Sequence, residues 1–205
     1  MVATRNDSAP HIRDVGSMNW FKRSRRNFTI TPTKVLVSAV GAENHLLSMA
    51  ESDGAVYTKH YSNVIISSVN SADSLIDKIK TEAFDIVHVV LNLNPDGTFD
   101  QTPAGQIIRV CADTGVRLIF FAAENSPEIY TAHFPSGKID LVMTIDRKEE
   151  KFSAFLHSLL SKMISGKTVA DAWVELAPQT ERASQQDDLP SCIFAVGQGR
   201  VVLQS

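Results

Sequence analysis

The chain has 205 residues, of which 43% are hydrophobic and 21% charged, and its formal net charge is −3. This length suits one folded domain with a tail, and the apolar content is ordinary for a protein with a substantial core. The small net charge excludes a strongly basic polyanion-binding protein and a strongly acidic solvating one.

Residues 1–30 predict an arm outside a folded domain of residues 31–205. Met1–Ser17 is polar and aperiodic, which is typical of a disordered or loosely docked segment. A basic cluster with aromatic neighbours follows, formed by Trp20, Phe21, Lys22, Arg23, Arg25 and Arg26. Such a cluster suits nucleic acid or an acidic partner. We favour a solvated arm whose two aromatic side chains cover an apolar patch, because no nucleic-acid motif surrounds the charges.

From Pro32 onward, apolar β-branched runs alternate with segments of helical periodicity. The apolar runs predict strands at Lys34–Val40, Asn63–Ser67, Phe84–Leu91, Val116–Ala122 and Asp140–Ile145. Apolar residues at helical spacing predict helices at Ala42–Ser52, Ser71–Thr81, Pro103–Asp113, Lys151–Met163 and Val169–Ala177. The chain is expected to end in a strand pair, Cys192–Val196 and Arg200–Leu203, joined through a hairpin at 197–199.

Local signals refine several of these boundaries. Asp53-Gly54 is expected to end the first helix, Asn70 or Ser71 to cap the second, and Thr168 to cap the last. Asn92–Thr102 is a polar loop with a turn signal at residues 94–97. The overall alternation predicts a three-layer α/β sandwich, with a mostly parallel sheet and helices on both faces. In such folds ligands gather at the carboxyl ends of the strands.

Common cofactor motifs are absent. The segment 165–168, Ser-Gly-Lys-Thr, resembles the end of a P-loop, but Ser161 stands where that loop needs an earlier glycine. Gly41 stands alone after the first strand, so no dinucleotide fingerprint follows it. The six histidines show no i,i+4 pairing, so neither a metal nor a cofactor is expected.

Single residues and compartment follow from simple rules. His88 lies in a buried strand and is expected to be a core histidine, and His157 is expected on a helix surface. Cys111 and Cys192 predict reduced core residues of a cytoplasmic protein. No apolar run approaches the roughly 18 residues of a membrane span, so no membrane partner is expected. The basic N-terminus lacks the apolar stretch of a signal peptide.

Two strand ends, Phe84–Asn92 and Leu118–Ser126, together resemble those of the caspase-like CHAT family, in the clan of cysteine peptidases that includes caspases and separase. In that family a strand D-h-h-H-h-x-x-H-G (h, hydrophobic) carries the catalytic histidine at its second His. The next strand, L-h-h-L-x-A-C-x-S, carries the nucleophilic cysteine. Met163–Trp173 is similar to a further family segment, h-x-x-G-x-S-h-x-x-A-h. The resemblance covers residues 34–204 and implies a caspase-like fold.

Both reactive positions of that family are substituted here. His88 matches the first, non-catalytic histidine, Asn92 stands at the second, and Glu124 stands at the cysteine position. An amide takes up no proton near neutral pH, and a carboxylate is a poor nucleophile for an amide bond. The resemblance therefore implies a catalytically inactive member that binds another protein as a regulatory or adaptor module. We expect the cleft, or a surface such as the arm at Trp20–Phe28, to contact this protein.

Polar side chains near these strand ends form a candidate binding rim. Its members are Asn92, Asn94, Asp96, Glu124, Asn125 and Ser126, and they suit a polar ligand or a cation. The simpler interpretation is that they are ordinary loop residues. Two other functions stay open: a nucleotide-type sensing module that offers helix N-terminal amides after Gly41 to an anion, and an enzyme that uses Glu124 as an acid or base.

Overall fold

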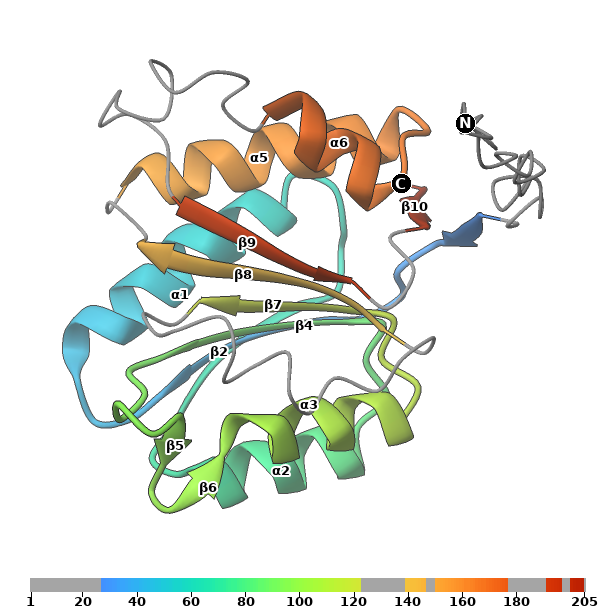
Figure 1. The fold of residues 1–205 in the computed structure, drawn as a ribbon. Coiled ribbons are helices and arrows are strands. Elements are labelled where there is room, and N and C mark those ends of the chain that lie inside the picture. Colours follow the sequence, from blue (N-terminus) through green and yellow to red (C-terminus); the bar gives the residue numbers. More distant parts are fainter. Residues whose placement is uncertain (1–26, 123–138, 147–149, 177–190, 197–199, 205) are drawn as a thin grey trace, which may run out of the picture.

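The computed structural model describes residues 27–122, 139–146, 150–176, 191–196 and 200–204. Its elements form three layers (Figure 1). The strands are β1 (Phe28–Ile30), β2 (Val35–Val40), β3 (Val64–Val69), β4 (Ile86–Leu91), β5 (Thr98–Phe99), β6 (Thr102–Pro103), β7 (Leu118–Ala122), β8 (Asp140–Asp146), β9 (Ser191–Val196) and β10 (Val201–Leu203). The helices are α1 (Asn44–Tyr57), α2 (Ala72–Thr81), α3 (Ala104–Asp113), α5 (Glu150–Ile164) and α6 (Val169–Leu176).

The central sheet has six strands in the order β3-β2-β4-β7-β8-β9. Strands β3, β2, β4, β7 and β8 are parallel, and β9 runs antiparallel to β8. Helices α1, α5 and α6 cover one face, and α2 and α3 cover the other (Figure 1). The predicted three-layer α/β sandwich with a mostly parallel sheet is confirmed.

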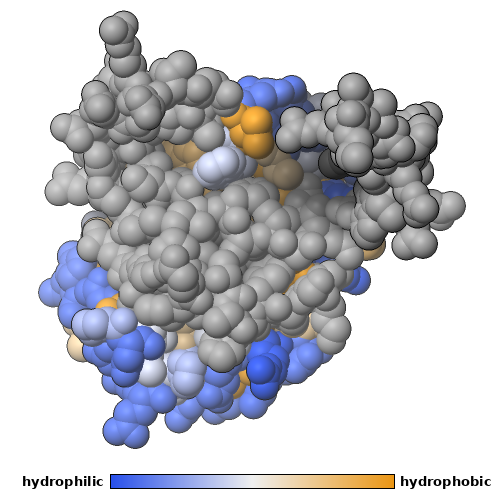
Figure 2. Space-filling view, viewed as in Figure 1, coloured by the Kyte–Doolittle hydropathy of each residue, from blue (hydrophilic) through white to orange (hydrophobic). Residues whose placement is uncertain are grey.

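Strand β4 explains why the two faces form separate cores. All six of its residues are buried, and successive side chains of a strand point to opposite faces. Val87 and Val89 therefore pack with α2 and α3, whereas Ile86 and Val90 pack with α1 and α5. Polar residues cover the outer side of α2 and α3, as the lower part of Figure 2 shows.

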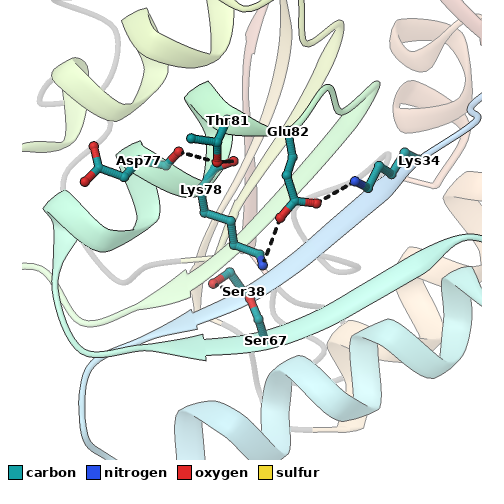
Figure 3. Close-up of polar contacts among 7 residues, drawn as sticks. All are labelled: Lys34, Ser38, Ser67, Asp77, Lys78, Thr81 and Glu82. Atoms are coloured by element: carbon teal, nitrogen blue, oxygen red, sulfur yellow. Dashed lines mark hydrogen bonds and ion pairs between the residues drawn. The ribbon is translucent and has the colours of Figure 1, made fainter.

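A charged cluster ties the end of α2 to the start of β2 (Figure 3). Glu82, just after α2, accepts from Lys34 Nζ at 2.5 Å and from Lys78 Nζ at 3.4 Å. These hydrogen bonds lower the pKa of the Glu82 carboxyl, with the bond from Lys34 contributing most. At the same edge of the sheet, Asp85 Oδ2 accepts from the backbone N–H of Thr33 at 2.7 Å.

The structure corrects the predicted end of the first helix. Helix α1 continues through Asp53 and Gly54 to Tyr57. Gly54 does not end the helix, because its missing side chain makes room for Ile66 of β3: a Cβ there would lie 2.4 Å from Ile66 Cδ1. Tyr57 is fully buried, so the last turn contributes to the core. A glycine that commonly marks a helix end here marks a close contact between the helix and β3.

The predicted strand pair at the C-terminus is wrong. Strand β9 pairs with β8, and β10 pairs in parallel with β1. Asp140 of β8 fixes the start of β10, because its carboxylate accepts from the N–H groups of Arg200 and Val201 at 3.0 and 2.9 Å. Residues 28–30, predicted as the end of the arm, thus belong to the folded part of the chain. The segment 197–199 and the cluster Trp20–Arg26 lie outside the described residues.

Other predictions hold. Ser71 Oγ accepts from the N–H of Ser74 and caps α2, and Thr168 Oγ1 accepts from the N–H of Asp171 and caps α6. The turn at 94–97 forms, with Gly97 N donating to Asn94 O at 2.8 Å. The loop around it is more ordered than predicted, because residues 98–103 form the short hairpin β5–β6.

Candidate functional site

The order of the parallel strands locates the candidate site. After β2 the chain adds β3 on one side, and after β3 it crosses to add β4 on the other side of β2. The loops that follow β2 and β4 therefore leave the sheet in opposite directions. In open α/β sheets ligands bind at such a switch point, outside the carboxyl ends of the strands. The candidate site is the edge formed by the loops after β2 and β4.

The loop after β2 begins with Gly41, whose backbone has φ +123°. This conformation is essentially restricted to glycine. Gly41 N donates to Val69 O at 2.9 Å, so the turn is fixed to the end of β3. A Cβ at Gly41 would lie 3.7 Å from the ring of Phe99, which comes from the hairpin after β4. This is ordinary van der Waals contact, so the backbone conformation, and not a lack of space, is what requires glycine at this turn.

Three polar side chains meet at this edge. Asn92 follows β4 directly, and its Nδ2 donates to Glu43 Oε2 at 2.7 Å. His45 Nε2 lies 3.3 Å from the same oxygen. The side chains of Glu43 and His45 are 53% and 56% exposed, so solvent and a ligand can reach both. Glu43 is also the residue that precedes the first turn of α1.

This arrangement suits hydrogen bonding better than covalent catalysis. Glu43 offers a carboxylate and Asn92 an amide, both of which bind donors. A cysteine peptidase would need an accessible thiol at such an edge. The thiol of Cys111 instead lies within α3 and is fully buried. Burial raises the pKa of the Cys111 thiol to about 12. A thiol of this kind is neither accessible nor ionised near neutral pH.

The predicted binding rim is only partly described. Asn92 lies at the edge, bonded to Glu43. Asn94 and Asp96 are exposed but bond within their own turn: Thr98 Oγ1 donates to Asp96 Oδ1 at 2.7 Å, and Asn94 Nδ2 donates to Thr98 Oγ1 at 3.1 Å. The hydrogen bond from the Thr98 hydroxyl is the main reason that the pKa of Asp96 is lowered. The remaining predicted members, Glu124, Asn125 and Ser126, lie outside the described residues.

The strands that carry the two substituted positions are neighbours. Strand β4 pairs in parallel with β7, with Val90 opposite Ala122. Asn92 follows two residues after Val90, and Glu124 follows two residues after Ala122 in the sequence.

A second polar cluster lies in the core beneath α1. His88 Nε2 is 3.0 Å from Asp53 Oδ2, and neither side chain is exposed. Ser153 Oγ of α5 donates to Asp53 Oδ1 at 2.9 Å, and the Tyr57 hydroxyl lies 3.3 Å from His88 Nδ1. Burial, and next the charge of Asp53, raise the pKa of Tyr57 well above its usual value. His88 and Asp53 are closed to a substrate, so the cluster joins α1, β4 and α5 structurally.

The prediction that His88 is a core histidine is therefore confirmed, as is the surface position of His157, which stacks on His60 with ring centroids 5.8 Å apart. Sequence reasoning missed Glu43 and His45 at the edge and Asp53 in the core. Glu43 has one signal: it comes two residues after the glycine that follows β2. Asp53 has none, because its partners are 35 and 100 residues away.

Comparisons with known protein families and with curated proteins give no match for this chain. Within the described ranges, no group of three metal-ligating side chains is found. Among the same residues, no helix combines the length and apolar character needed to cross a membrane.

Proposed function

We propose that this chain is a catalytically inactive caspase/CHAT-like protein that works as a protein-binding regulatory or adaptor module. The observation that carries the proposal is the hydrogen bond that Asn92 donates to Glu43. Asn92 stands where the resemblance expects the catalytic histidine, and its amide is bonded to Glu43 at the carboxyl end of β4. An amide held in this way contributes no general base.

The pairing of β4 with β7 supports the same proposal. In the family that the sequence resembles, the histidine and the cysteine follow consecutive strands whose ends must come together for catalysis. Here the two strands are adjacent and in parallel register. The position of Cys111 also supports the loss of peptidase chemistry. This thiol is fully buried, and burial raises its pKa, so it supplies no accessible thiolate at the edge.

The charges of the two loops favour a cationic segment of the partner. Residues 41–45 and 92–103 contain three carboxylates, Glu43, Asp96 and Asp100, and no lysine or arginine. All three are exposed. Carboxylates and amides together bind guanidinium and ammonium groups with charge-assisted hydrogen bonds. We therefore expect the edge to bind an extended basic segment of another protein.

The nucleotide-type alternative is less well supported. It requires the turn after Gly41 to offer helix N-terminal amides to a phosphate. The Glu43 carboxylate stands at that same turn, immediately before α1, and a fixed negative charge repels a phosphate. An enzyme that uses Glu124 as an acid or base is the third alternative. A set of metabolites tested by thermal shift and by turnover would reveal either function.

Restoring the two missing groups tests the inactive-peptidase proposal. Asn92→His combined with Glu124→Cys places an imidazole and a thiol at the two positions. If the positions adjoin, the imidazole lowers the pKa of the new thiol, so its alkylation by iodoacetamide at about pH 6 should be roughly tenfold faster than in Glu124→Cys alone. Mass spectrometry of the peptide that contains residue 124 measures this rate. Equal rates in the two variants would contradict the proposal, as would peptide cleavage by the wild-type protein that Glu124→Ala abolishes.

The binding part has its own test. Arrays of immobilised peptides that are either arginine- and lysine-rich or aspartate- and glutamate-rich are probed with the wild type and with Glu43→Gln. Basic peptides should bind the wild type, and Glu43→Gln should weaken them severalfold. Asp77→Asn is the matched control, since Asp77 is an exposed carboxylate on α2, outside both loops. An equal loss of basic-peptide binding in both variants would contradict a site at this edge, because the overall negative charge of the protein would then explain the binding.

A further inference from the structure

Strand β3 forms one end of the central sheet. Among the strands that the structure describes, it pairs with β2 alone. Asn63 O and Val69 O, at the two ends of β3, accept from Val35 N and Gly41 N of the β2 side at 3.0 and 2.9 Å. Backbone groups alternate in direction along a strand. The odd-numbered residues of this strand therefore bond to β2, and Val64, Ile66 and Ser68 direct their N–H and C=O groups outward.

This edge lacks the features by which proteins protect free strands. Native edges usually carry lysine, proline, a bulge or an inward-pointing charge. The sequence of β3, Val-Ile-Ile-Ser-Ser-Val, contains no charge, proline or glycine. Its pairing with β2 is regular over all six residues. Ile66 is 39% exposed and is one of the few large apolar residues on the described surface.

We propose that β3 pairs with the same strand of a second copy of this chain, so that the sheet continues through a symmetric dimer. The two strands run antiparallel about a two-fold axis at Ile66. Residues opposite each other in such a pair must point to the same face of the sheet. Pairing Ile66 with Ile66 of the second copy, and Val64 with Ser68, satisfies this rule. It also joins the residues whose backbone groups point outward in both copies.

Self-pairing fits the surroundings of β3 better than pairing with an unrelated strand. The register sets no like charges opposite each other, and it buries Ile66 against its own symmetry mate, which is the arrangement of an isologous interface.

Helix α1 and the turn that follows it add complementary charge. Ile66 contacts α1 at Gly54, and the exposed Glu51 and Lys59 lie on either side of that point. A two-fold axis there reverses the direction of α1. Glu51 of one copy and Lys59 of the other then lie on the same side of the two-fold axis.

The oligomeric state of the full chain tests this proposal. Sedimentation velocity is measured from about 1 µM to about 1 mM, the range in which a small interface associates. Ile66→Lys places two like charges at the axis, and Ser68→Pro removes an outward N–H. Val174→Lys is the matched control, because Val174 is an exposed apolar residue on α6, 56% accessible. Circular dichroism verifies that each variant is folded.

The expected result is a concentration-dependent dimer for the wild type and for Val174→Lys, and a monomer for Ile66→Lys and Ser68→Pro. A folded Ile66→Lys that still dimerises like the wild type would overturn the proposal, because the interface would then lie elsewhere. A wild type that stays monomeric throughout would also overturn it, and would leave the edge available to an extended peptide of another protein.

Discussion

Replacing Asp53 by alanine is expected to lower the free energy of unfolding by about 3–5 kcal/mol. Asp53 and His88 are both fully buried, with Oδ2 and Nε2 3.0 Å apart. Removing the carboxylate leaves the imidazole in the core without its charged partner. It also removes the acceptor of the Ser153 hydroxyl. The cost arises mainly from the desolvated groups left behind, and the intact pair itself stabilises the fold by less.

A double-mutant cycle separates these contributions. His88→Ala removes the imidazole and leaves the carboxylate buried, while the double variant leaves neither group without its partner. The double variant should therefore be less destabilised than the sum of the two single variants, by about 1–3 kcal/mol. The cavity left by His88 adds a cost of its own, which appears in both variants that lack the ring and cancels in the cycle.

Urea unfolding followed by far-UV circular dichroism measures these values. Glu51→Ala is the control, because Glu51 is exposed and lies two residues before Asp53 on α1; its effect should stay within about 0.5 kcal/mol. The m-value should be unchanged if both states keep their compactness. An Asp53→Ala variant as stable as Glu51→Ala, or strictly additive single variants, would refute the argument that Asp53 and His88 depend on each other in the core.

Three further predictions follow from single contacts. Burial, and next the neighbouring charge of His157, lower the pKa of His60 below its ordinary value; the unfolded chain then binds a proton first, so stability should fall as the pH drops through about 6.5. NMR titration should show a depressed pKa for His60 that rises in His157→Gln, and an unmoved pKa would dismiss the contribution of His157. Cys111 should resist iodoacetamide at about pH 8 in the native state and react in urea, since burial raises its pKa to about 12. Gly41→Ala should cost roughly 1–3 kcal/mol, because φ +123° is strained for any residue with a Cβ; a loss below that range in urea unfolding would contradict this reason.

The layers of the fold could be predicted because each strand and helix has a local signature. Strand β4 is apolar throughout, which indicates burial on both faces, and the structure buries all six residues. The cap of α2 at Ser71 follows from the side chain itself. The strand β9 was also recognised, but its partner was not. Pairing is decided by long-range geometry, and two strands close in sequence predicted a hairpin that the sheet does not contain.

Residues whose roles depend on distant partners escaped prediction for the same reason. Gly54 has the sequence signature of a helix end, yet it serves a contact with Ile66 twelve residues later. Asp53 stands next to it as an expected turn residue and instead contacts His88 in the core. In both cases a tertiary contact overrides the local preference of the residue. No pattern within one helix reveals such a contact.

The carboxyl edge of β2 and β4 shows how position and chemistry must be combined. The sequence singles out Asn92 because this residue has no titratable ring at a position where the resemblance expects a histidine. The structure adds what it has, a hydrogen bond to Glu43 from the neighbouring loop. A side chain fixed by a charged partner keeps its geometry, and fixed geometry is what a binding surface needs. A catalytic base must in addition take up a proton, which the Asn92 amide does not do. If the Glu43–Asn92 bond organises this edge, Asn92→Ala should weaken the binding of basic peptides about as much as Glu43→Gln does. Asn92→Ala that binds like the wild type would separate Asn92 from any role in recognition.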